Sequence, residues 1–549
     1  MLRQNYTRIN RNLAILLAVL AIGAVEAPPP AWAEPAAVTA DALKDRLDGT
    51  DALSAGGMPI DRAMLKAAYE ARSYEPVWAA PELAEMLVSA IGAADREGLD
   101  PESFRLGGLE DALADDTLDP IDRELMLSDR FLAYAGALAQ GRVAPASVDA
   151  DWLLPRPAFD PAATLQRVGA GEAVATVLQS LLPHEPDYDR LRQALQHYQA
   201  LADAGGWQPI VAPDKIEPGA KGDVVKAVRA RLIIEGDFAE NTDDGDIYNA
   251  PLVAAMKRFQ ARHGIFIDGR IGANTIAALN LSAADRVAAI RLALERLRSL
   301  PRDYPATRIM VNVPAASLVL YRDGTPALTS KVVVGSVEHP TPVFTARVVS
   351  VLFNPPWNVP TSIVKKEMQP ELKRNPGYLA KNHYILVGRA DGDPHGEDLD
   401  WKRTDILSHG WRLRQEPGPW NALGGVKLEL PNREDIYLHD TPARGLFARA
   451  MRAASHGCIR VEAARSLVSI LLGANWPAKA VDDAIDAGET RRVYLRPAVQ
   501  VFIIYVATFV DDDGTVEFRD DIYGRDRRLS EALSNLQTQA RTTTKSVPG

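Results

Sequence analysis

The spacing of hydrophobic residues changes along the chain and separates a helical part from a β-rich part. Over residues 34–205, apolar positions recur every three to four residues, as in 125–140, which ends before a glycine. A second run, 191–198, has the same spacing, and Asp187 or Asp189 is a candidate N-cap. The pattern predicts an all-α N-terminal domain, and because no group of catalytic side chains stands out in it, we expect a structural or docking role.

Residues 214–282 follow a linker rich in glycine and proline and predict three short helices. Residues 283–301 then form a longer helical pattern, in which Ser282 and Asp285 match a capping box. We expect this helix to connect the small domain to the part that follows. The apolar faces of the three short helices are Val225, Val228 and Leu232; Leu252, Met256 and Phe259; and Ile276 and Leu279.

From residue 306 to 526 the period becomes two, which predicts a β-rich domain. Strands over 317–322 and 327–334 are joined by Asp323-Gly324, a hairpin turn. Residues 361–412 are charged and helix-prone, so we interpret them as a lid inserted into this domain. Residues 527–549 are polar and predict a disordered tail. The predicted fold class is therefore α+β, with several domains.

Composition narrows the classes of function. A chain of 549 residues is too long for one hydrophobic core, so two to four domains are expected. Its hydrophobic content of 47% and charged content of 24% are typical of soluble globular proteins. The formal net charge of −10 argues against a nucleic-acid partner, which would require clustered cations.

The N-terminus predicts an export signal. Basic residues precede an apolar run over 13–25, and Ala31-Trp32-Ala33 matches a cleavage site before Glu34. The run is shorter than the ~20 residues that span a membrane, although an uncleaved anchor in the inner membrane is the alternative. We therefore expect residues 1–33 to be a signal peptide and the protein to be periplasmic.

Cys458 is the only cysteine in the chain and cannot form an internal disulfide. In an oxidising compartment an unpaired thiol is exposed to oxidation, so its presence needs a reason. It is either a buried apolar residue or a nucleophile. A zinc site that includes His439 and His456 is a third reading, but no further cysteine or acidic cluster accompanies it, and we expect no metal or cofactor.

The residues around Cys458 favour a nucleophile. His439 ends a predicted strand and is a candidate base, and Tyr437 shares its face because side chains alternate along a strand. Gly457 permits a sharp turn, which would direct the amides of Gly457 and Cys458 at an oxyanion. Such donors contribute ~2.7–4 kcal/mol each in acyl transfer. A helix predicted over 461–472 would add a favourable dipole.

Two segments resemble the catalytic motif of the L,D-transpeptidases (YkuD-like): Tyr-Leu-His-Asp-Thr-Pro at 437–442 and Ser-His-Gly-Cys-Ile-Arg at 455–460. The further segments 353–360, 414–423 and 521–526 resemble the large Gram-negative type, which has a helical scaffold and a lid. Residues 214–282 resemble a three-helix peptidoglycan-binding domain, through Gly222-Asp223-Val-Val, 254–260 and 268–272.

The resemblance implies a β-sandwich-like catalytic domain and a two-step acyl transfer. Cys458 would attack the bond between diaminopimelate and D-Ala in a donor tetrapeptide stem, with His439 as base. The acyl group would pass to an amine of a second stem, and carbapenems would acylate the thiol. The imidazole would be held by a backbone carbonyl, without a carboxylate from Asp440. The expected oxyanion and substrate residues are Tyr437, Ser455, His456, Gly457 and Arg460.

Three alternatives remain open. Water in place of the amine would give an L,D-carboxypeptidase, and a lipoprotein as acceptor or leaving group would give an enzyme that attaches or detaches it. A wall-binding scaffold without activity is the non-enzyme reading. The presence of Tyr437, His439, Gly457 and Cys458 argues against the last of these.

Overall fold

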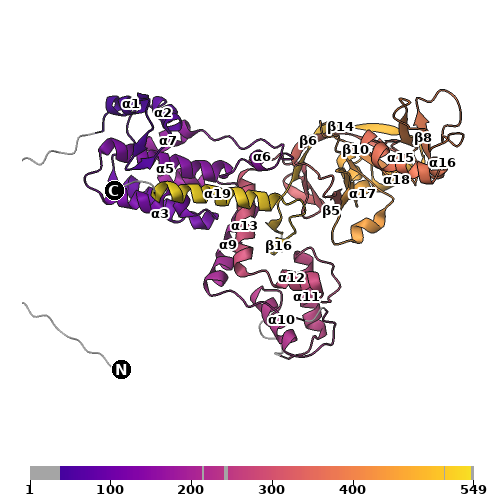
Figure 1. The fold of residues 1–549 in the computed structure, drawn as a ribbon, viewed down its shortest axis with the longest axis horizontal. Helices are drawn as coiled ribbons and strands as arrows, with labels where there is room; N and C mark the ends of the chain where they lie inside the picture. The colour runs from indigo at the N-terminus through magenta and orange to yellow at the C-terminus, as the bar shows by residue number, and fades with distance from the viewer. Residues whose placement is uncertain (1–37, 213–214, 240–244, 512, 546–549) are drawn as a thin grey trace, which may run out of the picture.

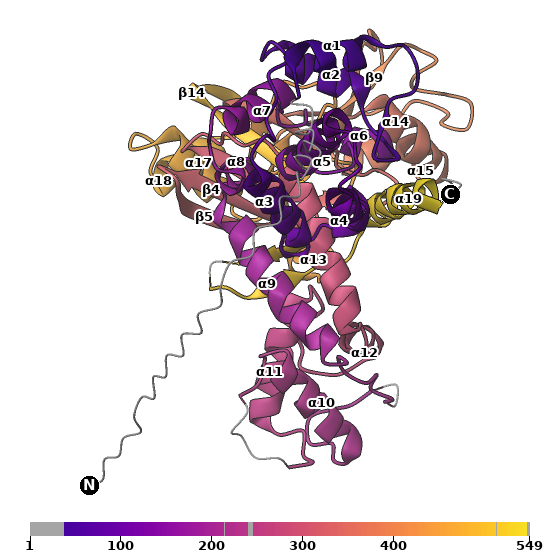
Figure 2. The same ribbon diagram turned by 90° about the vertical axis from the view of Figure 1, so that its left-hand side faces the viewer.

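The computed structural model describes residues 38–212, 215–239, 245–511 and 513–545. The predicted signal peptide, residues 1–33, lies outside the described residues. Within them, no helix combines the length and the apolar composition that a membrane crossing would need. The chain forms three lobes, with the N-terminal helices and the β-rich domain at opposite ends and a small helical domain projecting between them (Figures 1 and 2).

The N-terminal lobe is helical, as predicted, and has its own hydrophobic core. Helix α5 (Pro120–Gln140) lies at its centre and is buried on most of its surface. The capping prediction for α9 (Pro186–Asp203) was wrong: Glu185 is the N-cap, and Asp187 and Asp189 lie in the first turn, where carboxylates still favour the helix dipole.

The remaining elements of this lobe are α1 (Ala40–Asp48), β1 (Ser54–Ala55), β2 (Met58–Pro59), α2 (Arg62–Glu70), α3 (Pro81–Gly92), η1 (Ala94–Glu97), η2 (Pro101–Phe104), α4 (Leu106–Ala114), α6 (Pro145–Val148), α7 (Pro161–Gly169) and α8 (Val174–Gln179).

The small domain contains the three predicted helices, α10 (Asp223–Ile234), α11 (Ala250–Arg262) and α12 (Ala273–Leu279). Their apolar faces meet in a separate core that includes Phe259. The domain is tied to the β-rich domain by Arg519, which donates to the Arg262 carbonyl at 2.6 Å. It therefore has its own core and also a fixed contact with its neighbour.

Helix α13 (Ala283–Arg298) connects the three lobes and begins with the predicted capping box between Ser282 and Asp285. It packs along α9 and also contacts α5, β15 and α19 (Figure 2). Its Arg286 donates to the Ala278 carbonyl of the small domain at 2.8 Å, so one helix touches every lobe. At its end the guanidinium of Arg298 is fully buried. That group donates to the Glu97 carbonyl at 2.7 Å and to the Tyr188 hydroxyl at 2.9 Å, and it pairs with Glu295 at 3.2 Å.

The β-rich domain is built on one nine-stranded mixed sheet in the order β12-β5-β13-β11-β10-β6-β14-β3-β4. An additional pairing of β4 with β5 closes the sheet on itself around the main hydrophobic core. The Asp323-Gly324 turn has positive φ at both residues, as its hairpin requires. Near the C-terminus, the long strand β14 is followed after a short break by β15.

The strands of this domain are β3 (Arg308–Asn312), β4 (Ser317–Arg322), β5 (Thr325–Gly335), β6 (Phe344–Phe353), β10 (Val426–Glu429), β11 (Leu438–His439), β12 (Ala453–Ser455), β13 (Ile459–Val461), β14 (Arg491–Ile504), β15 (Thr508–Val510) and β16 (Val516–Phe518), and its helices are η4 (Arg444–Ala448), α17 (Ala464–Leu472) and α18 (Ala478–Asp486).

The lid predicted over 361–412 is a small unit with its own core and, in addition to helices, a three-stranded sheet in the order β7-β9-β8. The lid extends beyond the predicted bounds at both ends, because strand β9 pairs with β7 and β8. The lid elements are β7 (Trp357–Asn358), α14 (Thr361–Ile363), the π-helical turn η3 (Val364–Met368), α15 (Gln369–Arg374), α16 (Tyr378–Lys381), β8 (Tyr384–Val387) and β9 (Arg412–Gln415).

The prediction of a disordered tail over 527–549 was wrong for most of that stretch. Residues Arg525–Lys545 form helix α19, which runs back from the β-rich domain towards the N-terminal lobe (Figure 1). Leu529 is buried and the helix contacts η2, α6 and α13. The polar composition hid this helix because contacts with other elements stabilise it.

Replacement of Arg298 with Met tests the role of α13. We expect a loss of ~3–5 kcal/mol in the free energy of unfolding, because Glu295 stays buried without its cation. Urea unfolding followed by circular dichroism measures it. Arg291→Met is the matched control, since Arg291 lies on the exposed side of the same helix. Equal effects of the two substitutions would contradict this account.

Candidate active site

Parallel pairing of β11 with β13 brings the two predicted catalytic segments together. Leu438 pairs with Ile459 and His439 with Arg460, and the Ile459 amide donates to the Tyr437 carbonyl at 3.0 Å. This register places Tyr437 beside Cys458. Segments nineteen residues apart in the sequence thus become neighbours in one sheet.

Cys458, His439, Tyr437, Arg460 and His456 all line one cavity of about 1050 Å³. The catalytic sheet forms one wall, and the opposite wall belongs to the lid. Ser455 also lines it, whereas Gly457 lies behind the surface. The residues that the lid contributes include Trp357, Glu367, Met368 and Tyr384.

The Cys458 thiol is half-buried and faces polar groups from the strand opposite. Its sulfur lies 3.6 Å from the Asp435 carbonyl oxygen, to which the thiol donates. Burial raises the pKa of the thiol, while the amide and hydroxyl of Tyr437 and the charges of Lys427 and Arg460 act in the opposite direction. Burial dominates, so the thiol is protonated at neutral pH.

His439 is buried, and its ring is held by backbone carbonyls. Nδ1 donates to the Asp440 carbonyl at 2.6 Å, which leaves Nε2 as the acceptor. Burial lowers the pKa of His439 to about 3, assisted by the charge of Arg460. The Asp440 carboxylate instead accepts from the Gly425 amide at 3.1 Å and pairs with Arg444 at 3.4 Å. The imidazole is therefore a neutral base oriented without a carboxylate, as expected.

Both pKa shifts favour the neutral forms, so the resting cavity contains a neutral thiol and a neutral imidazole. A raised thiol pKa and a lowered imidazole pKa both disfavour a thiolate–imidazolium pair. The described contacts contain no hydrogen bond between Cys458 and His439. The site can nevertheless transfer a proton to Nε2 as a bond forms to sulfur, which is general-base activation of a nucleophile.

The turn at Gly457 differs from the expected arrangement. Its φ of 101° suits glycine, but its amide donates to Ser455 Oγ at 3.2 Å and is occupied. Ser455 Oγ in turn donates to the Cys458 carbonyl at 2.5 Å. The Cys458 amide has no acceptor among the described residues, so it is the remaining donor for an oxyanion.

The expected help from a helix dipole is also absent from this site. Helix α17 begins at Ala464, and strand β13 separates it from Cys458. The prediction over 461–472 placed the helix three residues too early, because the apolar residues of β13 continue into the helical pattern.

His456 contacts the lid, and Arg460 faces the cavity. His456 Nε2 lies 2.6 Å from Glu367 Oε1 of the lid, and its ring packs against His339 at 4.6 Å between centroids. Arg460 is half-buried, and its Nε has no hydrogen-bond partner among the described residues. A guanidinium in that position can bind a carboxylate of a ligand.

Lys427 was missed by the sequence reasoning. It pairs with His439 across β10 and β11, and its ammonium lies 4.0 Å from the centre of the Tyr437 ring. The sequence signal for Lys427 was its place between two apolar residues of a strand, Val426 and Leu428, which are both buried. The register that points it at the site cannot be read from the sequence. Within the described part of the chain, no group of three or more histidine, cysteine or acidic residues is arranged to hold a metal.

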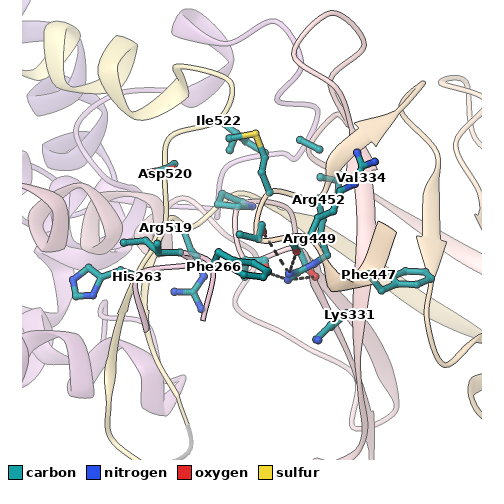
Figure 3. Close-up of a pocket in the computed structure, with 18 of the residues that line it drawn as sticks. His263, Phe266, Lys331, Val334, Phe447, Arg449, Arg452, Arg519, Asp520 and Ile522 are labelled. Atoms are coloured by element: carbon teal, nitrogen blue, oxygen red, sulfur yellow. Dashed lines mark hydrogen bonds between the residues drawn. The ribbon is translucent and has the colours of Figure 1, made fainter. Parts of the chain in front are cut away.

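A second cavity of about 370 Å³ lies between the small helical domain and the catalytic sheet (Figure 3). Phe266 of the small domain is exposed at its rim, and Lys331 lies on the opposite side. Arg452 donates to the carbonyls of Ala315 and Ala316, at 3.1 and 3.3 Å. These bonds fix the loop that leads into β12. This cavity therefore adjoins the strand that carries Ser455.

Comparison with known proteins agrees with this architecture. Residues 63–195 match a sequence profile described as a scaffold domain, and residues 221–279 match one described as "Putative peptidoglycan binding domain". Residues 306–493 match the profile of the L,D-transpeptidase catalytic domain. Residues 306–493 are therefore similar to L,D-transpeptidase catalytic domains. The expected fold class is confirmed, with a helical N-terminal region, a peptidoglycan-binding domain and a β-rich catalytic domain.

A curated protein of Haemophilus influenzae named "Putative L,D-transpeptidase" is 36% identical over 242 residues, which is 44% of this chain and 48% of that protein. The chain thus spans about half the length of the curated relative it matches. An L,D-transpeptidase of Xylanimonas cellulosilytica aligns over 54% of this chain and 99% of its own, at 15% identity and a TM-score of 0.19. One of Stackebrandtia nassauensis aligns over 54% and 97%, at 13% identity and a TM-score of 0.22.

The protonation state of Cys458 can be tested with iodoacetamide. Alkylation follows the thiolate fraction, and burial raises the thiol pKa, so we expect the rate at Cys458 to rise at higher pH than in a cysteine-containing peptide. Mass spectrometry of the single thiol gives the rates for both. A midpoint below that of the peptide would instead indicate a thiolate–imidazolium pair.

Proposed function

We propose that this protein is an L,D-transpeptidase that cross-links peptidoglycan through a cysteine acyl-enzyme. The observation that carries the proposal is the cavity in which Cys458, His439 and Arg460 meet beneath the lid. A neutral base, a single thiol and an unoccupied amide at Cys458 supply the groups that acyl transfer requires. The peptidoglycan-binding domain in the same chain supports a cell-wall substrate.

In the first step Cys458 Sγ attacks the carbonyl carbon between diaminopimelate and D-Ala in a donor tetrapeptide. The thiol proton passes to His439 Nε2, and the Cys458 amide stabilises the oxyanion. The C–N bond then breaks, the proton passes from His439 to the departing amine, and D-Ala leaves. A thioester on Cys458 remains.

In the second step the amine of another stem attacks the thioester and gives up a proton to His439. The C–S bond breaks, the sulfur leaves as a thiolate and takes the proton back, and the new amide cross-links two stems. Arg460 would bind a stem carboxylate, because its half-buried guanidinium faces the cavity. Carbapenems would acylate the same sulfur, since their ring carbonyl offers an equivalent electrophile.

Hydrolysis is the second candidate, because an open cavity admits water as well as an amine. Water in the second step would release a tripeptide and give an L,D-carboxypeptidase, and a lipoprotein lysine would give an attachment enzyme. Product analysis by mass spectrometry, with one and then two muropeptide substrates, separates these outcomes. Formation of monomeric tripeptide alone would refute the transferase proposal.

We further propose that the protein works in the periplasm, where the cell-wall substrate lies. The support is the export pattern of residues 1–33. Retention of the apolar run 13–25 would anchor the protein in the inner membrane, and cleavage after Ala33 would release it. N-terminal sequencing of the protein from a cell fraction distinguishes the two.

Replacement of Cys458 with Ala should abolish both D-Ala release and the covalent adduct, because no other thiol is present. His439→Ala should retain the thiol and lower turnover by ~10²–10⁴-fold, the usual contribution of a general base. Intact-mass spectrometry with a carbapenem and D-Ala assays measure the two effects. Cross-linking by Cys458→Ala at the parent rate would show that another residue is the nucleophile.

Removal of the lid tests its part in substrate binding. Asn358 pairs with Arg414, so an Asn-Gly turn can replace residues 359–413 and join the two ends. We expect turnover with muropeptides to fall by about tenfold to a hundredfold, because one wall of the cavity is lost. Alkylation of Cys458 by iodoacetamide should keep the raised pH midpoint of the parent protein, which an unfolded chain would lose, and this serves as the control for folding. Unchanged muropeptide turnover would exclude a role for the lid.

A further inference from the structure

Thr341 is a buried residue outside the cavity whose hydroxyl contacts the turn that carries the nucleophile. Its Oγ1 donates to the Gly457 carbonyl at 2.8 Å and accepts from the Gly335 amide at 2.9 Å. Its side chain is fully shielded from solvent. The hydroxyl thus has both a donor and an acceptor role satisfied, and one of its partners adjoins Cys458.

The contact with Gly457 fixes the direction of the Cys458 amide. The Gly457 carbonyl and the Cys458 N–H belong to one planar trans peptide unit, so they point in opposite directions. Glycine has little conformational preference of its own, and the orientation of this unit therefore depends on contacts. With the Gly457 carbonyl held by Thr341, the Cys458 N–H points away from Thr341. Since that N–H is the remaining oxyanion donor, Thr341 controls its direction.

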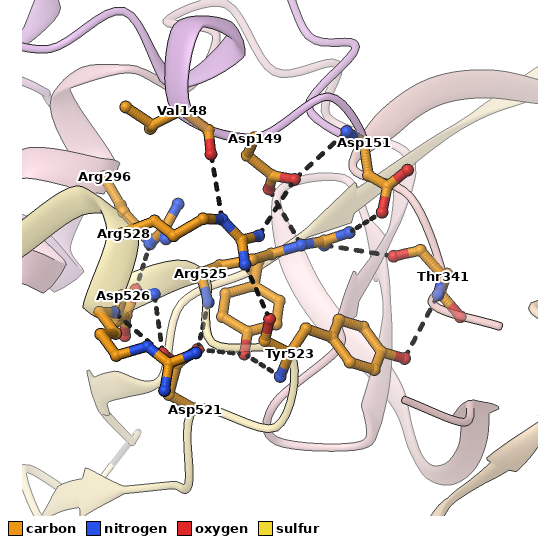
Figure 4. A network of polar contacts seen from close by, with 12 residues as sticks. Val148, Asp149, Asp151, Arg296, Thr341, Asp521, Tyr523, Arg525, Asp526 and Arg528 are labelled. Atoms are coloured by element: carbon orange, nitrogen blue, oxygen red, sulfur yellow. Dashed lines mark hydrogen bonds and ion pairs between the residues drawn. The ribbon is translucent and has the colours of Figure 1, made fainter. Parts of the chain in front are cut away.

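Thr341 is in turn held by the segment 521–526, whose sequence motif the catalytic site does not use. The Tyr523 hydroxyl donates to the Gly335 carbonyl at 2.6 Å and accepts from the Thr341 amide at 3.3 Å. Arg525 Nη1 donates to the Thr341 carbonyl at 3.2 Å. The backbone of Thr341 is therefore fixed by this segment (Figure 4), and its side chain is fixed by Gly335 and Gly457.

Arg525 connects this arrangement to the N-terminal lobe. Its guanidinium is fully buried and pairs with Asp149 at 2.9 Å and with Asp151 at 3.1 Å, both in the segment after α6 (Figure 4). The same segment pairs with the backbone of Val343, which donates to the Asp151 carbonyl at 2.8 Å and accepts from the Leu153 amide at 2.7 Å. A continuous series of polar contacts thus runs from the N-terminal lobe to Gly457.

We propose that Thr341 is a positioning residue for the nucleophile and that the N-terminal helical lobe, acting through Arg525, keeps it in place. The lobe then has a role in the reaction although it contributes no residue to the cavity. Only the turnover part of this proposal rests on the proposed function. Reactivity of the thiol with a small electrophile tests the remainder independently.

The first experiment compares full-length Thr341→Val, which keeps the shape but not the hydroxyl, with Thr341→Ser, which keeps the hydroxyl. We expect Thr341→Val to lower kcat for D-Ala release by about tenfold to a hundredfold with little change in KM, and Thr341→Ser to recover most of it. Thr164→Val is the matched control, because Thr164 is also buried and also donates to a backbone carbonyl, at 2.7 Å. Equal kcat values for Thr341→Val and the wild type would overturn the proposal.

The second experiment changes the end of the contact series that lies at the N-terminal lobe, where Arg525 pairs with Asp151. The Asp151 side chain is 45% exposed, so Asp151→Asn should fold, and Arg525→Lys keeps the charge. We expect Arg525→Lys, alone and with Asp151→Asn, to change the pH profile of Cys458 alkylation by iodoacetamide. Arg527→Lys is the control, since Arg527 is exposed on the same helix.

Alkylation needs no muropeptide, so failure of the proposed function leaves this readout intact. Profiles of the Arg525 variants that coincide with those of Arg527→Lys and the wild type would show that the N-terminal lobe does not influence the nucleophile. A changed profile without muropeptide turnover in the wild type would support the positioning role and refute the proposed function.

Discussion

The parallel pairing of β11 with β13 is the contact on which the catalytic site depends. Strand β11 is only two residues long, yet its register with β13 sets Tyr437 beside Cys458 and His439 beside Arg460. A shift of one residue would turn each of these side chains to the opposite face. The closure of the sheet through β4 and β5, and the core beneath it, hold this short pairing in place.

Burial then decides the electrostatics of the site. His439 is shielded from water and lies near the cations Arg460 and Lys427, so its imidazole is neutral, and the thiol beside it is protonated. A protonated thiol of this kind is less prone to oxidation, because the thiolate is the form that oxidises.

The lid, the N-terminal lobe and the small helical domain are all held to the β-rich domain by specific side-chain contacts. The lid completes the cavity and touches His456 through Glu367, and α13 joins all three lobes around the buried Arg298. The peptidoglycan-binding domain is fixed by Arg519 against the sheet that carries the catalytic residues. These contacts explain how four separate hydrophobic cores are joined into one connected structure.

The sequence alone identified the helical and β-rich regions, the three short helices, the capping box at Ser282 and the residues Cys458 and His439. These features depend on local periodicity or on short motifs, which survive without knowledge of the fold. Helix α19 was missed because its stability comes from packing against distant elements. The interval from Cys458 to α17 was misjudged because apolar strand and helix residues run together there.

Only the tertiary structure decided how the Gly457–Cys458 peptide is oriented, where Lys427 points and which carboxylates pair with Arg525. Each depends on contacts between residues far apart in the sequence: Gly457 with Thr341, Lys427 with His439, and Arg525 with Asp149. The sequence singled out Cys458 and His439 as the candidate nucleophile and base. Long-range pairing, burial and hydrogen bonding determined their protonation and orientation, because those properties arise only when distant segments meet.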